Sequence, residues 1–263
     1  MKLLVDADYI VYKSCAATEY EIDYGSDVIV VASRFSDAMS MIERELDKVR
    51  LNFPFELEET QLFFSDSINF RKTLDPAYKG HRNRKKPCGY RRCINELHTL
   101  YKCVIMSELE ADDALGIAAT LYTGNVIVSP DKDMRQIPGQ LFNMEEMMSV
   151  TAEEGRRWHL IQTLAGDQTD GYAGVPGIGV KRAEALFEKE GYTWKTVLDA
   201  FEAKGLTEDD ALLNARLAKI LTCDDYDFKQ NKFIPWNPSP SDYGADDGAA
   251  TKDETDRADS GEG

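Results

Sequence analysis

Three short apolar segments, each closed by an acidic side chain, constrain the fold of this chain more than any other feature. Lys2–Asp6 ends in an acid, Gln61–Phe64 is followed by Asp66, and Asn125–Ser129 is followed by Asp131. Segments of this length and apolar content are typical of buried strands. Because α/β sheets place their sites beyond the carboxyl ends of parallel strands, we expect these acids to gather along one edge of a mostly parallel sheet.

Patterns typical of helices fill much of the remaining chain. Apolar residues spaced three and four apart predict an amphipathic helix over residues 33–51, and a capping box from Thr151 to Glu154 begins another helix. Strands dominate before residue 145 and helices after residue 150. We therefore expect an α/β domain over residues 1–150, with helices flanking a mostly parallel central sheet, and a helical part over residues 151–238. Further helices are expected at about residues 90–102, 107–121, 193–203 and 208–222, whereas residues 17–32 fit no clear pattern.

The charge of the chain is strongly segregated. The formal net charge of −16 argues against phosphate binding through bulk electrostatics alone. Beyond Pro238 the chain is mostly Gly, Ser, Ala and Asp, with eight acidic residues against Lys252 and Arg257. Such a composition has almost nothing to bury, so residues 239–263 are expected to be a disordered acidic tail.

Residues 71–92 have the opposite bias, with nine lysines and arginines against one acid. A basic segment in an acidic protein is suited to hold a polyanion beside carboxylates that are kept for cations. Its tyrosines add rings that can stack on bases. The alternative is a solvated surface loop, which charge runs usually are. The candidate DNA-binding residues of this segment are Arg71, Lys72, Tyr78, Arg84, Lys85 and Lys86.

Several classes of protein are disfavoured by what the sequence lacks. Five cysteines without paired C-x-x-C spacing speak against a disulfide framework and structural zinc, and favour a reducing cytosol. The histidines have no zinc-binding spacing, and neither a P-loop nor a G-x-S-x-G motif occurs. Without an apolar run of about 18 residues or a signal peptide, we expect a soluble, cytoplasmic protein that binds no membrane.

Residues 166–183, GDQTDGYAGVPGIGVKRA, combine two kinds of chemistry. Asp167 and Asp170 are three residues apart and therefore face the same side of a helical turn. The glycines that follow permit a tight hairpin whose N–H groups approach a ligand closely, and the helix that begins after them favours an anion at its N-terminus. The alternative is a Gly/Pro loop with a solvated Asp pair. The candidate DNA-binding residues of the hairpin are Gly174, Val175, Gly177, Ile178, Gly179 and Lys181.

The acids at strand ends and helix starts are interpreted together as a metal site. Each has a simpler explanation alone: Glu110, for instance, fits a capping box begun by Ser107. Gathered at one edge, however, they would repel one another unless cations neutralised them. Magnesium prefers such oxygen ligands, and two ions about 3.5–4 Å apart would activate a water and stabilise the leaving oxygen of a phosphodiester. The candidate metal ligands are Asp6, Asp66, Glu110, Asp112, Asp113, Asp131, Asp133, Asp167 and Asp170.

Five motifs, taken in order, resemble a known family. They are LLVDAD, SDSINFRKTLDPAYKGHRNRKKPCGY, ELEADDALG, IVSPDKD and GDQTDGYAGVPGIGVKRA. With them the chain resembles a bacteriophage 5′-3′ exonuclease of the flap-endonuclease superfamily, in the form found in short-tailed phages. The resemblance covers most of residues 1–16 and 60–235. It implies the PIN-like 5′-nuclease fold with a helix-hairpin-helix element, and a nuclease that acts in phage DNA replication.

The resemblance also assigns roles to residues. It places Asp6, Asp66, Glu110, Asp112 and Asp113 in a first metal cluster, and Asp131, Asp133, Asp167 and Asp170 in a second. Lys79 and Arg82 match the basic pair of an arch, at about residues 71–92, that contacts the scissile phosphate, and Tyr78 matches a stacking position. Gly174 to Gly179 match a hairpin that grips duplex backbone, in the family often with a potassium ion. Asp8 is not securely matched.

The main hypothesis is a monomeric 5′-nuclease, dependent on magnesium or manganese, that removes nucleotides from double-stranded or flapped DNA and, as the family suggests, RNA from RNA–DNA hybrids. Two other classes remain open. The acids at positions 6 and 8 fit a haloacid-dehalogenase phosphatase, whose first Asp is a nucleophile, although that class has no use for a glycine hairpin. A non-catalytic DNA-binding module would use the hairpin without a carboxylate cluster. If the chain is phage-encoded, the resemblance places it in the host cytoplasm.

Overall fold

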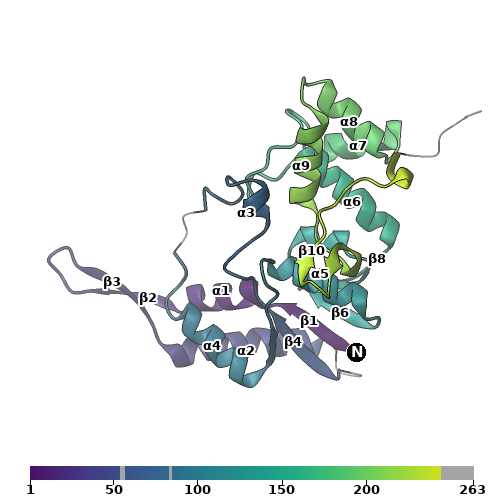
Figure 1. Cartoon of the computed structure of the whole chain (residues 1–263). Helices are drawn as coiled ribbons and strands as arrows, with labels where there is room; N and C mark the ends of the chain where they lie inside the picture. Colours follow the sequence, from purple (N-terminus) through teal and green to yellow (C-terminus); the bar gives the residue numbers. More distant parts are fainter. Residues whose placement is uncertain (54–56, 83–84, 244–263) are drawn as a thin grey trace, which may run out of the picture.

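The computed structural model describes residues 1–53, 57–82 and 85–243. Figure 1 shows a twisted sheet in the lower half of the molecule and a group of helices above it. The sheet has six strands in the order β5-β4-β1-β6-β7-β8, and only β8 runs antiparallel to its neighbour. The expected mostly parallel sheet is therefore confirmed. Its strands are β1 (Lys2–Asp6), β4 (Glu59–Phe63), β5 (Lys102–Val104), β6 (Asn125–Val128), β7 (Gly139–Phe142) and β8 (Met147–Val150).

Alternating side chains of β1 fill two cores. Leu3 and Val5 pack on one face of the sheet against α1 (Ala7–Ala17), α2 (Phe35–Leu51) and α4 (Tyr90–Leu100). Leu4 points the other way and packs against α5 (Ala111–Leu121). This period of two is that of a strand buried on both faces, as a central parallel strand must be.

The acid-bearing strands lie side by side. β1 pairs in parallel with β4 on one side and with β6 on the other. Asp6, Asp66 and Asp131, which end or follow these strands, consequently share the same edge of the sheet. The sequence-based placement of these acids is correct, and this edge carries the site described below.

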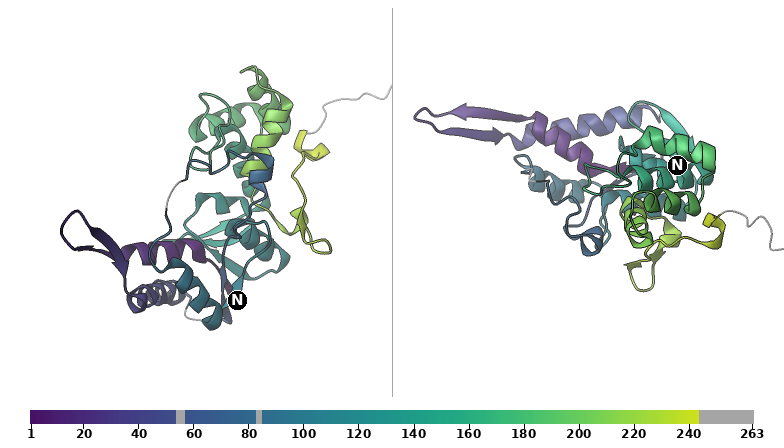
Figure 2. Two further views of the ribbon diagram at one scale, coloured as in Figure 1. Left: turned by 60° about the vertical axis from the view of Figure 1, so that its left-hand side comes forward. Right: turned by 90° about the horizontal axis from the view of Figure 1, so that it is seen from above.

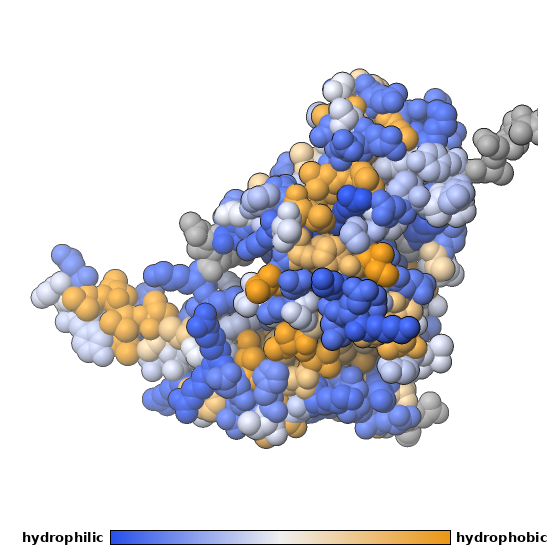
Figure 3. Space-filling model, viewed as in Figure 1, coloured by the Kyte–Doolittle hydropathy of each residue, from blue (hydrophilic) through white to orange (hydrophobic). Residues whose placement is uncertain are grey.

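Residues 17–32, which fit no pattern in the sequence, form a hairpin that stands away from the body (Figures 1 and 2). Its strands are β2 (Glu19–Asp23) and β3 (Ile29–Ser33), which pair only with each other within the described residues. The side chains of Val28 to Val31 are all exposed, and Figure 3 shows the hairpin as a projecting hydrophobic surface. Exposure on both faces explains why no alternating pattern is visible in the sequence.

The C-terminal helices have a core of their own. They are α6 (Ala152–Ala165), α7 (Val180–Glu190), α8 (Trp194–Glu202) and α9 (Glu208–Ala218), preceded or followed by short elements. Thr151 begins α6 with the capping box that the sequence predicts, and Thr207 begins α9 with another. After α9 the chain returns to the sheet, where Ile220 packs with Leu4. The short elements are α3 (Arg71–Leu74), η1 (Lys132–Gln136), η2 (Cys223–Asp225), β9 (Tyr226–Asp227), β10 (Lys232–Phe233) and η3 (Pro240–Tyr243).

Three details differ from the sequence-based expectations. The helix expected from Ser107 begins at Ala111, because Glu110 is its N-cap and shares a capping box with Asp113. The helix expected to end at residue 222 ends at Ala218. The tail expected from residue 239 has a folded start, since η3 packs beside α8. Residues 244–263, the rest of that tail, lie outside the described residues. No helix in the described ranges is both long and apolar enough to span a membrane.

Candidate active site

A cavity of about 560 Å³ opens at the acid-bearing edge of the sheet. Its described lining contains tyrosines, lysines and arginines beside the carboxylates, and neither histidine nor cysteine. The acids come from the ends of β1, β4 and β6, from the start of α5 and from the loop after α6. Sequence positions more than 160 residues apart therefore meet in one cavity. The carboxylates lining it are Asp6, Asp8, Asp66, Glu110, Asp112, Asp131, Asp133 and Asp170.

One part of the cavity has carboxylates that repel one another. Burial and then repulsion from Asp8 raise the pKa of Asp6 to about 6, although Ser129 Oγ donates a hydrogen bond of 3.0 Å to its Oδ2. Burial, followed by repulsion from Asp6 and Asp131, raises the pKa of Asp112 well above its usual range. Mutually repelling carboxylates of this kind favour a bound cation.

The donor set fits a hard divalent cation. Carboxylate oxygens are the ligands that magnesium and manganese prefer, and softer nitrogen or sulfur donors are missing from the described lining. Across the described ranges, however, no three His, Cys, Asp or Glu side chains are grouped closely enough to hold a metal ion as they stand. The chain's own cations lie among several of the acids. The two predicted metal clusters therefore stay a prediction.

Lys132 is one of these internal cations, and sequence reasoning missed it. Its Nζ lies 3.0 Å from Asp133 Oδ1 and 2.8 Å from Asp167 Oδ2. Although burial alone would lower the pKa of Lys132, its hydrogen bonds to these carboxylates raise it above the usual value. Asp167 does not itself line the cavity. The Asp-Lys-Asp order in the sequence, with a base between two candidate ligands, is the signal that could have revealed this bridge.

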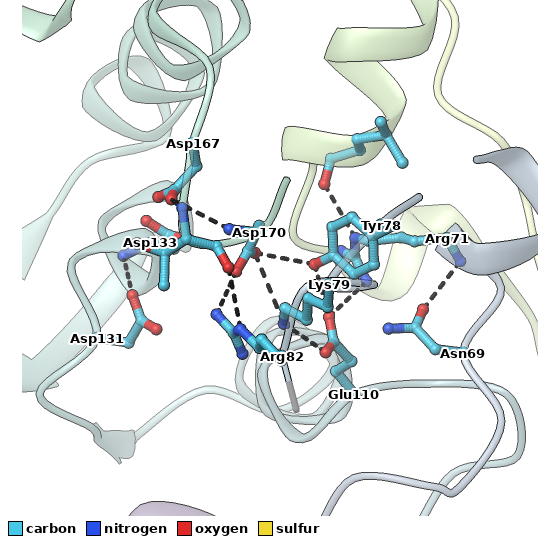
Figure 4. A network of polar contacts seen from close by, with 12 residues as sticks. Asn69, Arg71, Tyr78, Lys79, Arg82, Glu110, Asp131, Asp133, Asp167 and Asp170 are labelled. Carbon is cyan, nitrogen blue, oxygen red and sulfur yellow. Dashed lines mark hydrogen bonds and ion pairs between the residues drawn. The ribbon is translucent and has the colours of Figure 1, made fainter. Parts of the chain in front are cut away.

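Lys79 and Arg82 are the second group of internal cations (Figure 4). Lys79 Nζ lies 2.5 Å from Glu110 Oε1, and Arg82 Nη2 lies 2.6 Å from Asp170 Oδ1. Two contacts to main-chain carbonyls fix this part of the basic segment on the loop after α6, because Lys79 N donates to Asp170 O at 2.7 Å and the side-chain Arg82 Nε donates to Thr169 O at 3.0 Å. Both predicted catalytic cations therefore line the cavity among the acids.

The surroundings of Tyr78 do not suit the stacking role expected for it. Only 1% of this residue is exposed, and its ring packs with Tyr172, Leu217 and Ala218. Its hydroxyl lies 3.0 Å from Glu110 Oε2 and 2.9 Å from Asp170 Oδ2. A ring enclosed in this way has no free face for a base.

The surroundings of Arg71 and Asp113 also do not suit their predicted roles. Both side chains are buried, and they form a two-pronged ion pair, with Nη1–Oδ2 at 2.6 Å and Nη2–Oδ1 at 2.8 Å. Arg71 Nε further donates to Leu217 O at 3.0 Å. Both carboxylate oxygens of Asp113 accept hydrogen bonds from Arg71, and Asp113 does not line the cavity. The predicted DNA contact of Arg71 and the predicted metal ligand Asp113 stay predictions, and in this arrangement the two side chains are paired with each other.

The remaining basic side chains of the segment are more accessible. Lys72 and Lys85 are exposed, whereas Lys86 lines the cavity with its Nζ 4.5 Å from the centre of the Tyr90 ring. Arg84 lies outside the described residues. Tyr90, which the sequence suggests only as a ring, donates its hydroxyl to Asp8 Oδ1 at 2.7 Å. Asp8 also accepts from Ser65 N at 2.8 Å, so it holds the edge of the sheet together.

Asp66, which also lines the cavity, connects the segments around residues 66 and 108. A hydrogen bond from the Glu108 backbone lowers the pKa of Asp66, and Ser67 N donates to its other oxygen at 2.6 Å. These contacts leave the carboxylate ionised and facing the cavity. It remains a predicted metal ligand.

The glycine hairpin has one buried and one exposed half. Gly174 has φ +62°, and a Cβ there would lie 2.3 Å from Gly166 N, so this glycine serves close packing inside the protein. Val175 is buried in the core of the helical part. Gly177, with φ +82°, and Gly179 are exposed, and a Cβ on Gly179 would meet nothing within 4 Å. Ile178 is half-buried and Lys181 exposed, so the face available to a ligand runs from Gly177 to Lys181.

Comparison with known proteins adds three kinds of finding. No protein-family model matches the chain. The chain is 27% identical to the exodeoxyribonuclease of Enterobacteria phage T3 over 90% of this chain and 92% of that protein. It is 31% identical to a flap endonuclease Xni of Shewanella sp. (strain W3-18-1) over 60% of this chain and 70% of that protein.

Solved structures show the same fold. The 5′-exonuclease of phage T5 with bound zinc ions superposes with a TM-score of 0.57 at 16% identity, over 83% of this chain and 93% of that one. A phage T5 flap endonuclease in complex with DNA and metal ions gives a TM-score of 0.54 at 15% identity, over 82% and 92% of the two chains. The sheet and its acidic edge thus define a PIN-like 5′-nuclease fold. The chain belongs to the flap-endonuclease superfamily of metal-dependent 5′-nucleases, and it is similar to the exonucleases of phages.

Proposed function

We propose that this chain hydrolyses phosphodiester bonds of DNA from 5′ ends and at flaps, with two magnesium ions held at the acidic edge of the sheet. The observation that carries the proposal is the cavity itself, which is lined by carboxylates from β1, β4, β6 and α5 together with Lys79 and Arg82. The T5 nuclease crystallised with DNA and metal ions supports DNA as the substrate. Removal of RNA from RNA–DNA hybrids belongs to the same proposal.

The carboxylates divide into two proposed ligand groups. Asp6, Asp66, Glu110 and Asp112 hold one ion, and Asp131, Asp133, Asp167 and Asp170 hold the other, with manganese able to replace magnesium. When bound, the ions supply an activated water and stabilise the leaving oxygen. Asp113, part of the first cluster in the sequence-based prediction, is left out of the proposed ligand groups because it forms an ion pair with Arg71.

Lys79 and Arg82 are the proposed catalytic cations. Their side chains form ion pairs with Glu110 and Asp170. Metal ions bound by these carboxylates would free both side chains to contact the scissile phosphate, where negative charge grows in the transition state. The main-chain contact of Lys79 with Asp170 O keeps this segment beside the cavity during this exchange.

The DNA is proposed to follow two basic surfaces. Lys72, Lys85 and Lys86 contact the strand that enters the cavity, and each phosphate contact adds to the salt dependence of binding. The exposed half of the hairpin, from Gly177 to Lys181, presents backbone N–H groups and a helix N-terminus to the duplex, together with a potassium ion. Arg84 is kept in the first group on its sequence alone. The chain is proposed to act as a monomer in the host cytoplasm during phage DNA replication.

The two other classes of function are less well supported. A haloacid-dehalogenase phosphatase needs an accessible nucleophilic aspartate, but Asp6 caps α1 and accepts hydrogen bonds from Tyr9 N and Ser129 Oγ. A non-catalytic DNA-binding module has no use for neighbouring carboxylates that repel one another, such as Asp6 and Asp112. Metal-dependent release of nucleotides from DNA separates the nuclease from both.

Removing divalent metal is expected to abolish cleavage and to leave DNA binding. A 5′-labelled flap and a 5′-labelled duplex are incubated with magnesium, with manganese and with excess chelator, and cleavage is followed on a gel while binding is followed by anisotropy. A lost metal site costs several kcal/mol of transition-state stabilisation, equivalent to a rate reduction of about a thousandfold or more. Full cleavage in chelator contradicts the proposal. A 3′-labelled duplex establishes the polarity.

Two glycine substitutions are expected to separate packing from duplex binding. Gly174→Ala forces a Cβ against Gly166 and should destabilise the fold by about 1–3 kcal/mol. Gly179→Ala has room for its methyl group and an ordinary backbone conformation, so stability should be unchanged. If the hairpin backbone contacts phosphate, this methyl group should weaken duplex affinity about tenfold. Thermal unfolding and duplex binding measure both effects. Unchanged duplex affinity in Gly179→Ala means that this backbone does not approach DNA.

A further inference from the structure

Tyr78 occupies a special position between two acids of the cavity (Figure 4). Its hydroxyl oxygen lies 3.0 Å from Glu110 Oε2 and 2.9 Å from Asp170 Oδ2. Glu110 caps the start of α5, whereas Asp170 lies in the loop between α6 and α7. One hydroxyl group therefore connects carboxylates that come from the two halves of the chain.

The hydroxyl is held in place by its surroundings. The ring is buried among Tyr172, Leu217 and Ala218, and the Arg71 guanidinium lies 5.9 Å from its centre. Because the ring cannot turn away, the position of the hydroxyl is set by the core. A phenol at this point separates the two carboxylates by a fixed distance and shares its proton between them.

The other contacts of these two carboxylates are of a different kind. Lys79 and Arg82 reach Glu110 and Asp170 from long, flexible side chains of which 17% and 41% are exposed. Such cations can leave when another cation arrives. The Tyr78 hydroxyl is neutral and enclosed, so it can remain hydrogen-bonded to oxygens that also hold a metal ion.

We infer that Tyr78 is a positioning residue whose hydroxyl fixes the separation of Glu110 and Asp170, and with it the separation of the two proposed metal-binding groups. The inference rests on the proposed function, since it treats these two acids as ligands of different ions. It assigns to the hydroxyl, and not to the face of the ring, the contribution that this residue makes to the reaction.

Tyr78→Phe tests the inference directly, because it keeps the ring and its packing and removes only the oxygen. A role in stacking on a base requires the ring and predicts no change in this variant. A role in positioning the acids predicts weaker metal binding. Tyr101→Phe is the matched control, since its hydroxyl also donates to a carboxylate, Glu43 Oε2 at 2.7 Å, far from the cavity.

Magnesium binding to the full-length protein without DNA is measured by titration calorimetry. Loss of a hydrogen-bonding partner behind a metal ligand typically costs 10–100-fold in metal affinity, so we expect a reduction of about tenfold or more in Tyr78→Phe and none in Tyr101→Phe. Single-turnover cleavage of a flap substrate should need a correspondingly higher magnesium concentration for half its maximal rate. Flap affinity in chelator should not change.

Three outcomes decide the matter. Weakened magnesium affinity, with cleavage restored at high magnesium, supports the inference. Unchanged magnesium affinity in a folded Tyr78→Phe variant overturns it. A lower melting temperature together with a rate loss that magnesium does not restore also overturns it, because the hydroxyl then serves only the fold. Failure of the proposed function is distinguishable, since the unmodified chain itself then shows no magnesium-dependent cleavage.

Discussion

Asp112→Asn is expected to reduce cleavage by about a thousandfold while making the metal-free protein more stable. The loss of activity follows from the removal of a charged oxygen ligand at the acidic edge of the sheet. The gain in stability follows from the same charge, because the half-buried Asp112 is repelled by Asp6 and Asp131 and accepts no hydrogen bond from the described residues. Removing a charge of this kind should stabilise the fold by roughly 1–3 kcal/mol near pH 7.

The gain should depend on pH in a defined direction. Burial, followed by repulsion from Asp6, raises the pKa of Asp112 above its usual value of 3.8 in the folded chain. The folded state therefore keeps a proton that the unfolded state releases, so the unmodified chain loses stability as pH rises from that value through the raised pKa. Asparagine does not titrate. The higher stability of Asp112→Asn should vanish below about pH 4. Above that pH it should grow until the pH exceeds the pKa of Asp112 in the folded chain.

Urea unfolding of both proteins in chelator, from pH 4 to pH 8, measures this difference. The same experiment with magnesium provides the control, because a cation bound by Asp112 stabilises the unmodified chain more than the variant. The difference in the free energy of unfolding between the two proteins should therefore shrink or change sign when magnesium is added. A variant that is less stable than the unmodified chain at pH 8 in chelator contradicts the prediction, as does one with normal cleavage.

The acidic edge of the sheet could be predicted because it depends on local sequence. Strand-forming segments that end in an acid, and the preference of parallel strands for a shared edge, are enough to bring Asp6, Asp66 and Asp131 together. The helix caps at Thr151 and Thr207 are equally local, since each depends on a partner three residues away.

What could not be predicted depends on partners far away in the sequence. Arg71 and Tyr78 lie in a basic run, and nothing nearby shows that they pair with Asp113 and Glu110. Because the side chains of a basic run are ordinarily solvated, composition alone predicts that Arg71 and Tyr78 are exposed and contact DNA. The segment Gly139–Phe142 was likewise missed as a strand, because it is short and only half of it is apolar.

The buried ion pair between Arg71 and Asp113 is one of these long-range contacts, and substitutions of both residues test it. Arg71→Met is expected to destabilise the protein by about 3–5 kcal/mol, because Asp113 is left as an unpaired charge in the core. The guanidinium also donates to Leu217 O at 3.0 Å, and this carbonyl loses its partner in the variant. The effect exceeds that of any exposed lysine in the same segment.

A double substitution should recover part of this loss. In Arg71→Met with Asp113→Asn the buried charge is absent, so the protein should be more stable than the Arg71→Met variant by about 1–3 kcal/mol. Full recovery is not expected, since the Leu217 carbonyl still lacks its donor. Lys72→Met is the matched control, because the neighbouring side chain is exposed and its loss should change stability by about 0.5 kcal/mol or less.

Urea unfolding gives the stabilities, and duplex binding at several salt concentrations separates the two possible roles of Arg71. A buried arginine makes no phosphate contact, so the salt slope of folded Arg71→Met should equal that of the unmodified chain, whereas a lost contact lowers the slope by about one. Lys72→Met is expected to lower it in that way. If Arg71→Met keeps its stability and loses one unit of slope, the guanidinium binds DNA and its ion pair with Asp113 does not stabilise the fold.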